Sequence, residues 1–207
     1  MTIGAKEQRF RAIGAATVPS SRSKHKLFMF ENLREDWITH ERDPWRQGLW
    51  VMVVYRFGRW RYGLKHRITR APFSFLYKIL FTFVQILTGI ELPCETKIGR
   101  RFKIEHFGGV IVSGDAVFGD DITIRNGVTV GLRHTGNRGS PIIGNRVDIG
   151  AGAKILGPII VGDDVIIGAN AVVIKDVPAR SIAVGIPARI IARQRGADEE
   201  IPFALVH

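Results

Sequence analysis

The chain has 207 residues and a formal net charge of +11, with 45% hydrophobic and 24% charged residues. This composition excludes an intrinsically disordered chain and allows one large domain or two small ones. A single cysteine, Cys94, excludes an internal disulfide framework and predicts a reducing, cytoplasmic environment. The first 26 residues contain no long apolar segment, so we expect no secretory signal there.

The N-terminal part of the chain is the most basic. Residues 1–70 contain fifteen Lys or Arg and six Asp or Glu, a balance of +9. Residues 1–28 show no periodicity and are predicted to form a flexible basic arm. A basic region of this kind can meet an anionic membrane surface, an anionic polysaccharide or nucleic acid, or can simply be solvated. The chain contains no nucleic-acid-binding motif, so we expect no nucleic-acid partner.

Residues 29–90 are predicted to form an α-helical region with three helices. The first covers about residues 31–41. The second begins at Asp43-Pro44, which suit an N-cap and a first helical position, and ends near Gly63. The third runs from Pro72 to residue 88 and is apolar on nearly every side.

This apolar helix has three interpretations. A buried helix that joins subunits or covers the next domain is favoured. The alternatives are a helix lying in a membrane interface and a membrane span, and an interior Lys78 makes a span costly. We therefore expect a cytoplasmic protein, with peripheral contact to the inner face of the membrane as an alternative.

Residues 91–192 carry an apolar residue at every sixth position. A helix cannot use a strict six-residue period, but a coil with three short flat faces can. The pattern therefore predicts a β-helix of hexapeptide repeats, followed by a tail over residues 193–207. It breaks once, at GLRHTGNRGSP from Gly131 to Pro141, which we expect to leave the coil as an extruded loop. The residues in step are Leu92, Ile98, Ile104, Val110, Ala116, Ile122, Val128, Ile143, Ile149, Ile155, Val161, Ile167 and Val173.

His106 is the candidate general base. One coil spans about eighteen residues, so Glu91, fifteen residues earlier, would lie one layer away. A carboxylate there could fix the tautomer of the imidazole, and a neutral His held in this way can take a proton from a hydroxyl. The alternative is a solvated His at a corner of the coil.

Three segments carry a resemblance to a known family: IGRRF from Ile98, HFGG from His106, and GDDITIRNGVTVG from Gly119. They are similar to colanic-acid-type polysaccharide O-acetyltransferases, in the serine acetyltransferase branch of the left-handed β-helix acyltransferases. The resemblance implies a mainly β fold, a left-handed parallel β-helix preceded by α-helices, which assembles as a homotrimer or a dimer of trimers. It also implies acetyl transfer from acetyl-CoA to a hydroxyl without a metal, with His106 as catalytic base and Glu91 as its partner.

The same resemblance implies residues for both substrates. Serine acetyltransferases carry Arg-His in the extruded loop where this chain has Gly139-Ser140, so a serine carboxylate would lose its guanidinium clamp. The predicted acceptor is therefore a sugar hydroxyl in exopolysaccharide or surface polysaccharide biosynthesis, and serine, in cysteine biosynthesis, is the alternative. The residues implied for the acceptor are Asp43, Glu105, His134 and Ser140, and those for acetyl-CoA are Gly131, Ala151, Lys154, Ala169 and Arg189.

Two other classes of protein are less favoured. A γ-type carbonic anhydrase shares the coil but needs three histidines around zinc, and His106 and His134 are one too few. A non-catalytic β-helix scaffold could bind membrane or nucleic acid through its basic helices. Interleaved Trp and Arg on one helix are better explained by packing.

Overall fold

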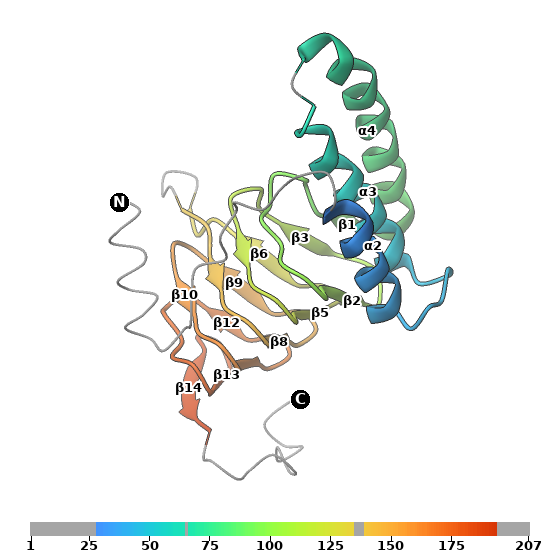
Figure 1. Cartoon of the computed structure of the whole chain (residues 1–207). Helices are drawn as coiled ribbons and strands as arrows, with labels where there is room; N and C mark the ends of the chain where they lie inside the picture. The colour runs from blue at the N-terminus through green and yellow to red at the C-terminus, as the bar shows by residue number, and fades with distance from the viewer. Residues whose placement is uncertain (1–27, 65, 135–138, 194–207) are drawn as a thin grey trace.

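A computed structural model describes residues 28–64, 66–134 and 139–193. In these residues three helices precede a coil of short strands and lie at the end of the coil that holds β1 and β2 (Figure 1). The predicted arm before residue 28 and the predicted tail after residue 193 lie outside the described residues. The helices are α2 (Phe28–Thr39), α3 (Gln47–Arg61) and α4 (Arg67–Thr88).

The described strands are two to four residues long and form three sheets, here called A, B and C. All neighbouring strands are parallel except β14, which pairs antiparallel with β13. The predicted left-handed parallel β-helix of hexapeptide repeats, with an α-helical N-terminal region, is confirmed. Sheet A holds β1 (Ile90–Glu91), β3 (Val110–Val112), β6 (Thr129–Gly131), β9 (Lys154–Leu156) and β12 (Val172–Val173). Sheet B holds β4 (Val117–Phe118), β7 (Ile142–Ile143) and β10 (Ile160–Val161). Sheet C holds β2 (Lys103–Glu105), β5 (Thr123–Arg125), β8 (Asp148–Ile149), β11 (Ile166–Ile167), β13 (Ser181–Val184) and β14 (Arg189–Ala192).

Apolar side chains stack inside the coil in columns that follow the strand register. In sheet C, Ile104 pairs with Ile124, Ile124 with Ile149, and Ile149 with Ile167. Each of these four side chains is at most 3% exposed. A single coil could not bury them, because each one is covered by the coils before and after it.

The expectation of a single break in the register is wrong, because the coil departs from an 18-residue step at three places, the last being near its C-terminal end, where Ile166 pairs with Ile182. Ile149 pairs with Ile167, 18 positions later, but Ile104 pairs with Ile124, 20 positions later. The two additional residues lie in the turn between β2 and β3, which contains His106. Phe118 pairs with Ile143, 25 positions later, because the extruded loop lies between β6 and β7. Counting in sixes misses the first break. A strand such as β3 has two inward positions, Val110 and Val112, so an insertion of two residues only moves the count from one inward position to the other.

The chain turns at three edges, named here after the sheets that they join. Edge AB carries the extruded loop. Edge BC has a residue with positive φ in every coil, and edge CA contains the turn at His106. The positive-φ residues of edge BC are Arg101, Asp121, Arg146, Asp164 and Arg180. The turns of edge CA contain residues 106–109, 126–127, 151–152 and 169–170.

Two helices begin elsewhere than predicted. Asp43 accepts a hydrogen bond from the Trp45 backbone N–H (2.9 Å) in a turn, and α3 begins only at Gln47. Asp43 is therefore not the N-cap of α3. The third helix begins at Arg67, with Pro72 inside it. A proline this close to a helix start removes only one backbone hydrogen bond, which the rest of the helix outweighs.

Buried polar contacts hold the helices against the first coil. Arg56 forms an ion pair with Asp36 (Nε–Oδ2 2.9 Å) and donates a hydrogen bond to the Gly99 carbonyl (3.0 Å). Tyr55 donates its hydroxyl proton to the Thr96 carbonyl (2.8 Å) and accepts from the Ile98 N–H (3.2 Å). Because each group has a partner, these contacts fix where the helices sit without leaving a buried charge unpaired.

Candidate functional site

His106 lies on edge CA, in the turn that is two residues longer than its neighbours. Its φ is +62°, and its side chain is exposed. A non-glycine residue with positive φ is uncommon. Here the wider turn aims the imidazole away from the coil, at a position where the β-helix presents it to solvent.

The turns of edge CA stack directly on one another along the coil. The Gly127 N–H donates to the Gly108 carbonyl, the Gly152 N–H to the Asn126 carbonyl, and the Asn170 N–H to the Ala151 carbonyl, each at 2.8 Å. The structure therefore brings His106, Ala151 and Ala169 to the same edge, with the turn at Gly127 lying between the layers of His106 and Ala151. Sequence reasoning assigned them to catalysis and to acetyl-CoA, but could not place them on one edge.

Small residues keep this edge narrow. Gly127 has φ +72°, and a Cβ built on it would lie 3.2 Å from the Gly152 Cα. Ala151 and Ala169 are half-buried, so backbone and methyl groups line the edge. Lys154 lies beside it, donating from Nζ to the Gly127 carbonyl (2.5 Å) and the Thr129 hydroxyl (3.0 Å). Beyond the His106 turn, where Phe107 is 56% exposed, the glycine and alanine residues leave a strip that suits a long, thin ligand.

Glu91 is the predicted partner of His106. It lies on β1, opposite Ile111 of β3, and its side chain is exposed. Its Oε2 accepts a hydrogen bond from Gln85 Nε2 (3.4 Å). Within the described residues no hydrogen bond or ion pair joins Glu91 to His106, so their pairing stays a prediction.

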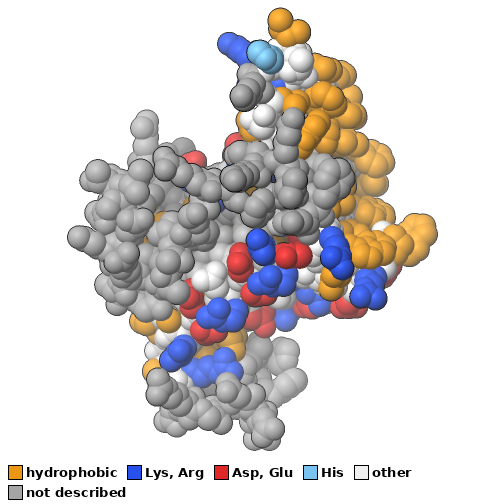
Figure 2. Space-filling view, viewed as in Figure 1, with side chains coloured by type: hydrophobic (Ala, Val, Ile, Leu, Met, Phe, Trp, Pro, Cys, Tyr) orange, Lys and Arg blue, Asp and Glu red, His pale blue; other side chains and the backbone are white. Residues whose placement is uncertain are grey.

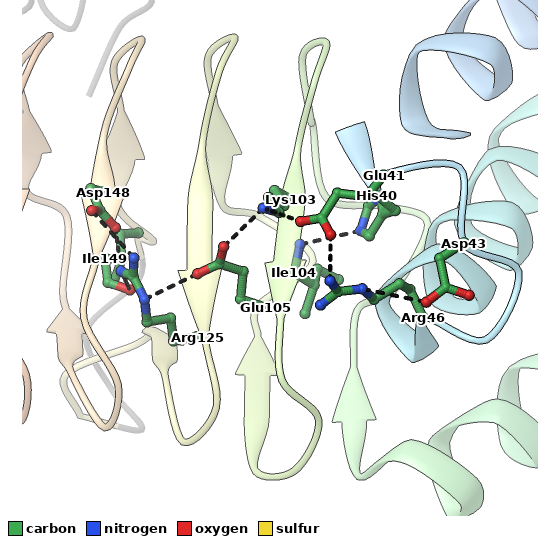
Figure 3. A network of polar contacts seen from close by, with 10 residues as sticks. All are labelled: His40, Glu41, Asp43, Arg46, Lys103, Ile104, Glu105, Arg125, Asp148 and Ile149. Atoms are coloured by element: carbon green, nitrogen blue, oxygen red, sulfur yellow. Dashed lines mark hydrogen bonds and ion pairs between the residues drawn. The ribbon is translucent and has the colours of Figure 1, made fainter. Parts of the chain in front are cut away.

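A row of alternating charges crosses the outer face of sheet C next to His106 (Figure 3). Glu105 lies 2.9 Å from Lys103 Nζ and 3.2 Å from Arg125 Nε. The hydrogen bond from Lys103, together with the charges of Lys103 and Arg125, lowers the pKa of the Glu105 carboxyl, so that it stays ionised. We call these residues the charge row: Asp43, Arg46, Glu41, Lys103, Glu105, Arg125 and Asp148.

The charge row reaches from sheet C to the helical region. Glu41 pairs with Lys103 (3.2 Å) and with Arg46 (2.5 Å), and Arg46 lies 3.7 Å from Asp43. Asp43 and Glu105, both predicted to bind the acceptor, thus belong to one row, although they do not touch. Sequence reasoning missed the other five side chains of the row. Glu105 and Arg125 lie opposite each other on β2 and β5, 20 residues apart. This pair could have been predicted if the first register break had been recognised.

His40 is a further residue that sequence reasoning missed. Its ring is 1% exposed; Nδ1 donates to the Asp36 carbonyl (2.8 Å), and Nε2 accepts from the Ile104 N–H (3.4 Å). Burial lowers the pKa of His40, which keeps this neutral tautomer. His40 therefore holds β2 in place two residues before His106. No periodicity in the sequence marks it.

The extruded loop lies on the other side of sheet A from His106. Ser140 is 5% exposed, and its Oγ lies 2.9 Å from the Ser113 Oγ, while His134 is exposed. Gly131 ends β6 on the same edge AB, where its carbonyl accepts from the Gly157 N–H (2.9 Å). Within one chain, the structure does not bring these residues to His106. Arg189 lies on β14, exposed, at the far end of sheet C.

Comparisons with known proteins agree with this geometry. The family model described as bacterial transferase hexapeptide (six repeats) matches residues 140–175. The serine acetyltransferase of Helicobacter pylori strain J99 is 42% identical over 160 residues, which cover 75% of this chain and 93% of the relative. Two crystal structures of serine acetyltransferases are also similar. The Brucella abortus structure in complex with coenzyme A has a TM-score of 0.70 and 30% identity, covering 82% of this chain and 70% of that one. The Neisseria gonorrhoeae structure in complex with serine has a TM-score of 0.67 and 30% identity, covering 81% and 70%.

These findings confirm one prediction and overturn another. The predicted enzyme class, an acetyl-CoA-dependent O-acetyltransferase, is confirmed. The predicted sugar hydroxyl of polysaccharide biosynthesis is wrong as the main acceptor, because the relatives are serine acetyltransferases. The prediction gave too much weight to the missing Arg-His pair in the loop, and no weight to the positive charges of the charge row. By its sequence and its fold alike, the chain belongs to the serine acetyltransferase family of hexapeptide-repeat transferases.

Proposed function

We propose that the protein is a serine O-acetyltransferase that transfers the acetyl group of acetyl-CoA to the hydroxyl of L-serine. The observation that carries the proposal is that the turn of His106 belongs to the same stack of turns, along edge CA, as those that hold Ala151 and Ala169. On edge CA, His106 lies next to turns lined by glycine and alanine, where acetyl-CoA is proposed to bind. Direct transfer needs the base and both substrates to be close together.

The proposed chemistry needs one base. His106 takes the proton of the serine hydroxyl while its oxygen attacks the acetyl carbonyl carbon. The new C–O bond forms, the C–S bond to CoA breaks, and the proton passes from His106 to the departing thiolate. The proton ends on the CoA thiol, so the cycle leaves His106 neutral again. Glu91 would orient the imidazole in this cycle.

The charge row supports an amino-acid acceptor. A zwitterion needs a negative partner for its ammonium group and a positive partner for its carboxylate. Glu105 is ionised, and Lys103 and Arg125 place positive charge beside it. These cations offer a substitute for the guanidinium that the loop lacks at Gly139-Ser140. They therefore weaken the main objection from sequence to serine as the acceptor.

A shared site in a homotrimer is part of the proposal. His106 stands on edge CA, whereas the extruded loop with His134 leaves from edge AB, and sheet A separates the two within one chain. A second copy could bring its loop to the His106 edge of the first. The proposed location is the cytoplasm, where an unpaired cysteine such as Cys94 stays reduced.

The test is an acetyl-transfer assay with the full chain. Purified protein and acetyl-CoA are mixed with L-serine, L-threonine or glucose, and released CoA is followed with a thiol reagent. We expect serine-dependent CoA release and O-acetylserine by mass spectrometry, from protein that light scattering sizes as a trimer or a pair of trimers. Faster acetylation of another hydroxyl than of serine would overturn the acceptor, and a fully active monomer would overturn the shared site.

A further inference from the structure

One side of α4 is an apolar stripe with no partner in the described structure. Tyr77, Val84 and Thr88 lie on the buried side, against α3 and the first coil. The opposite side forms a continuous hydrophobic strip along the helix (Figure 2). Three of its side chains are 69% exposed or more. The exposed large apolar residues of this stripe are Ile68 (89%), Phe75 (69%), Leu76 (44%), Ile79 (50%), Phe83 (58%), Ile86 (77%) and Leu87 (51%).

The stripe is a contiguous apolar surface, unlike the single exposed apolar side chains that are common on soluble proteins. Monomeric soluble proteins rarely expose a contiguous apolar patch of more than a few hundred Å², and larger ones mark contact surfaces. By length and composition, α4 is the one helix in the described part of the chain that could cross a membrane. The favoured prediction is a buried helix that joins subunits or covers the coil; within one chain one side of α4 covers α3 and the first coil, and the other side is exposed.

Basic and polar residues follow one border of the stripe. At about 100° per residue, Arg67, Ser74, Lys78 and Gln85 fall on the same line along the helix, next to the apolar side chains. The helix contains no acidic residue. An apolar face with a basic border is the pattern of a helix that lies in a membrane interface.

We propose that the apolar stripe of α4 docks on the surface of an anionic phospholipid bilayer. The apolar side chains would enter the boundary between headgroups and acyl chains, and Arg67 and Lys78 would reach anionic headgroups from the border of the stripe. Charge complementarity favours lipid over a second copy, since α4 has no carboxylate to meet the basic border of another α4. A position along the surface keeps Lys78 at the headgroups, whereas a span would bury it in hydrocarbon.

The binding test uses the full-length protein and vesicles. Flotation is compared for phosphatidylcholine vesicles and for vesicles that also contain phosphatidylglycerol, at low and at high salt. We expect flotation with the anionic vesicles at low salt and its loss at high salt, because surface attraction is screened. No flotation at low salt would overturn the proposal, and so would equal flotation with both kinds of vesicle.

Variants then show whether α4 is the surface involved. The double variant Phe75→Ser/Phe83→Ser should abolish flotation. The control Val53→Ser, which also replaces an exposed apolar side chain by serine but on α3, should leave flotation intact. Lys78→Gln should weaken binding by about fivefold, and Arg34→Gln on α2 should change it less. These sites are exposed, so we expect every variant to keep its acetyl-transfer activity and melting temperature. If Phe75→Ser/Phe83→Ser instead lowers the oligomer size without vesicles, a second copy covers the stripe and the lipid proposal fails.

Discussion

Edges BC and CA both use turns with positive φ, but the side chains at these turns differ. On edge BC, long charged side chains with positive φ face each other between coils: Arg101 Nε lies 2.5 Å from Asp121 Oδ1, and Arg146 Nε lies 2.6 Å from Asp164 Oδ1. On edge CA, the positive φ values beyond His106 belong mostly to glycine, as at Gly127. Edge BC covers its own turns with ion pairs, whereas edge CA leaves its backbone open.

This difference teaches that backbone geometry alone does not mark a functional edge. Both edges use left-handed turns, since every coil has to change direction there. What separates them is the side chain: a paired Arg and Asp satisfy each other, while a glycine or alanine leaves room for a ligand. His106 is the one histidine among the described residues of edge CA, and its side chain has no ion pair there.

The largest effect is expected at His106. His106→Ala should lower kcat by roughly 10²–10⁴-fold, the usual contribution of a general base, with little change in acetyl-CoA binding. Glu91→Gln should cause a smaller loss, because it removes only the charge that orients the imidazole. Initial rates and a CoA binding titration measure both. Near wild-type turnover in His106→Ala, with CoA binding unchanged, would remove His106 from the mechanism.

A middle-sized effect is expected from filling edge CA. Ala169→Leu should raise the KM for acetyl-CoA about tenfold, close to 1.4 kcal/mol of binding free energy, while kcat changes little. The added side chain would occupy the strip where the cofactor is proposed to lie. Ala71→Leu, at an exposed site of α4, is the size-matched control. An unchanged KM in Ala169→Leu would place the cofactor elsewhere.

The smallest effect is expected on edge BC. Arg146→Ala should lower the free energy of unfolding by about 0.2–1 kcal/mol, the usual value for an exposed ion pair, and leave acetyl transfer unchanged. The bond from Arg146 lowers the pKa of Asp164, so this stabilisation is present above the ordinary carboxyl pKa and is lost as pH falls through the lowered one. In denaturant titrations, the free energies of unfolding of the two proteins should therefore differ at neutral pH and converge at acid pH. A loss of activity comparable to that of His106→Ala would show that edge BC also serves the reaction.

Much of the fold and the centre of the site could be predicted from the sequence. The six-residue period is enough to predict the coil, because the apolar position of each repeat indicates which side chain points inward. The position of His106 and the resemblance of its surrounding segments pointed to edge CA as the candidate site. The starts of α3 and α4 were misjudged, since Asp43-Pro44 and Pro72 are strong helix-start signals, yet Asp43 closes a turn before α3 and Pro72 lies inside α4.

The sequence by itself determined the repeating coil, its inward columns and the family chemistry, because these depend on residues close together in the chain. Only the tertiary structure decided which outward residues meet. Glu105 faces Arg125 because two additional residues widen the turn at His106, and Ile104 is held by His40 because the helices fold back on the first coil. Contacts between coils depend on the length of every turn between them, and a local pattern does not record that length.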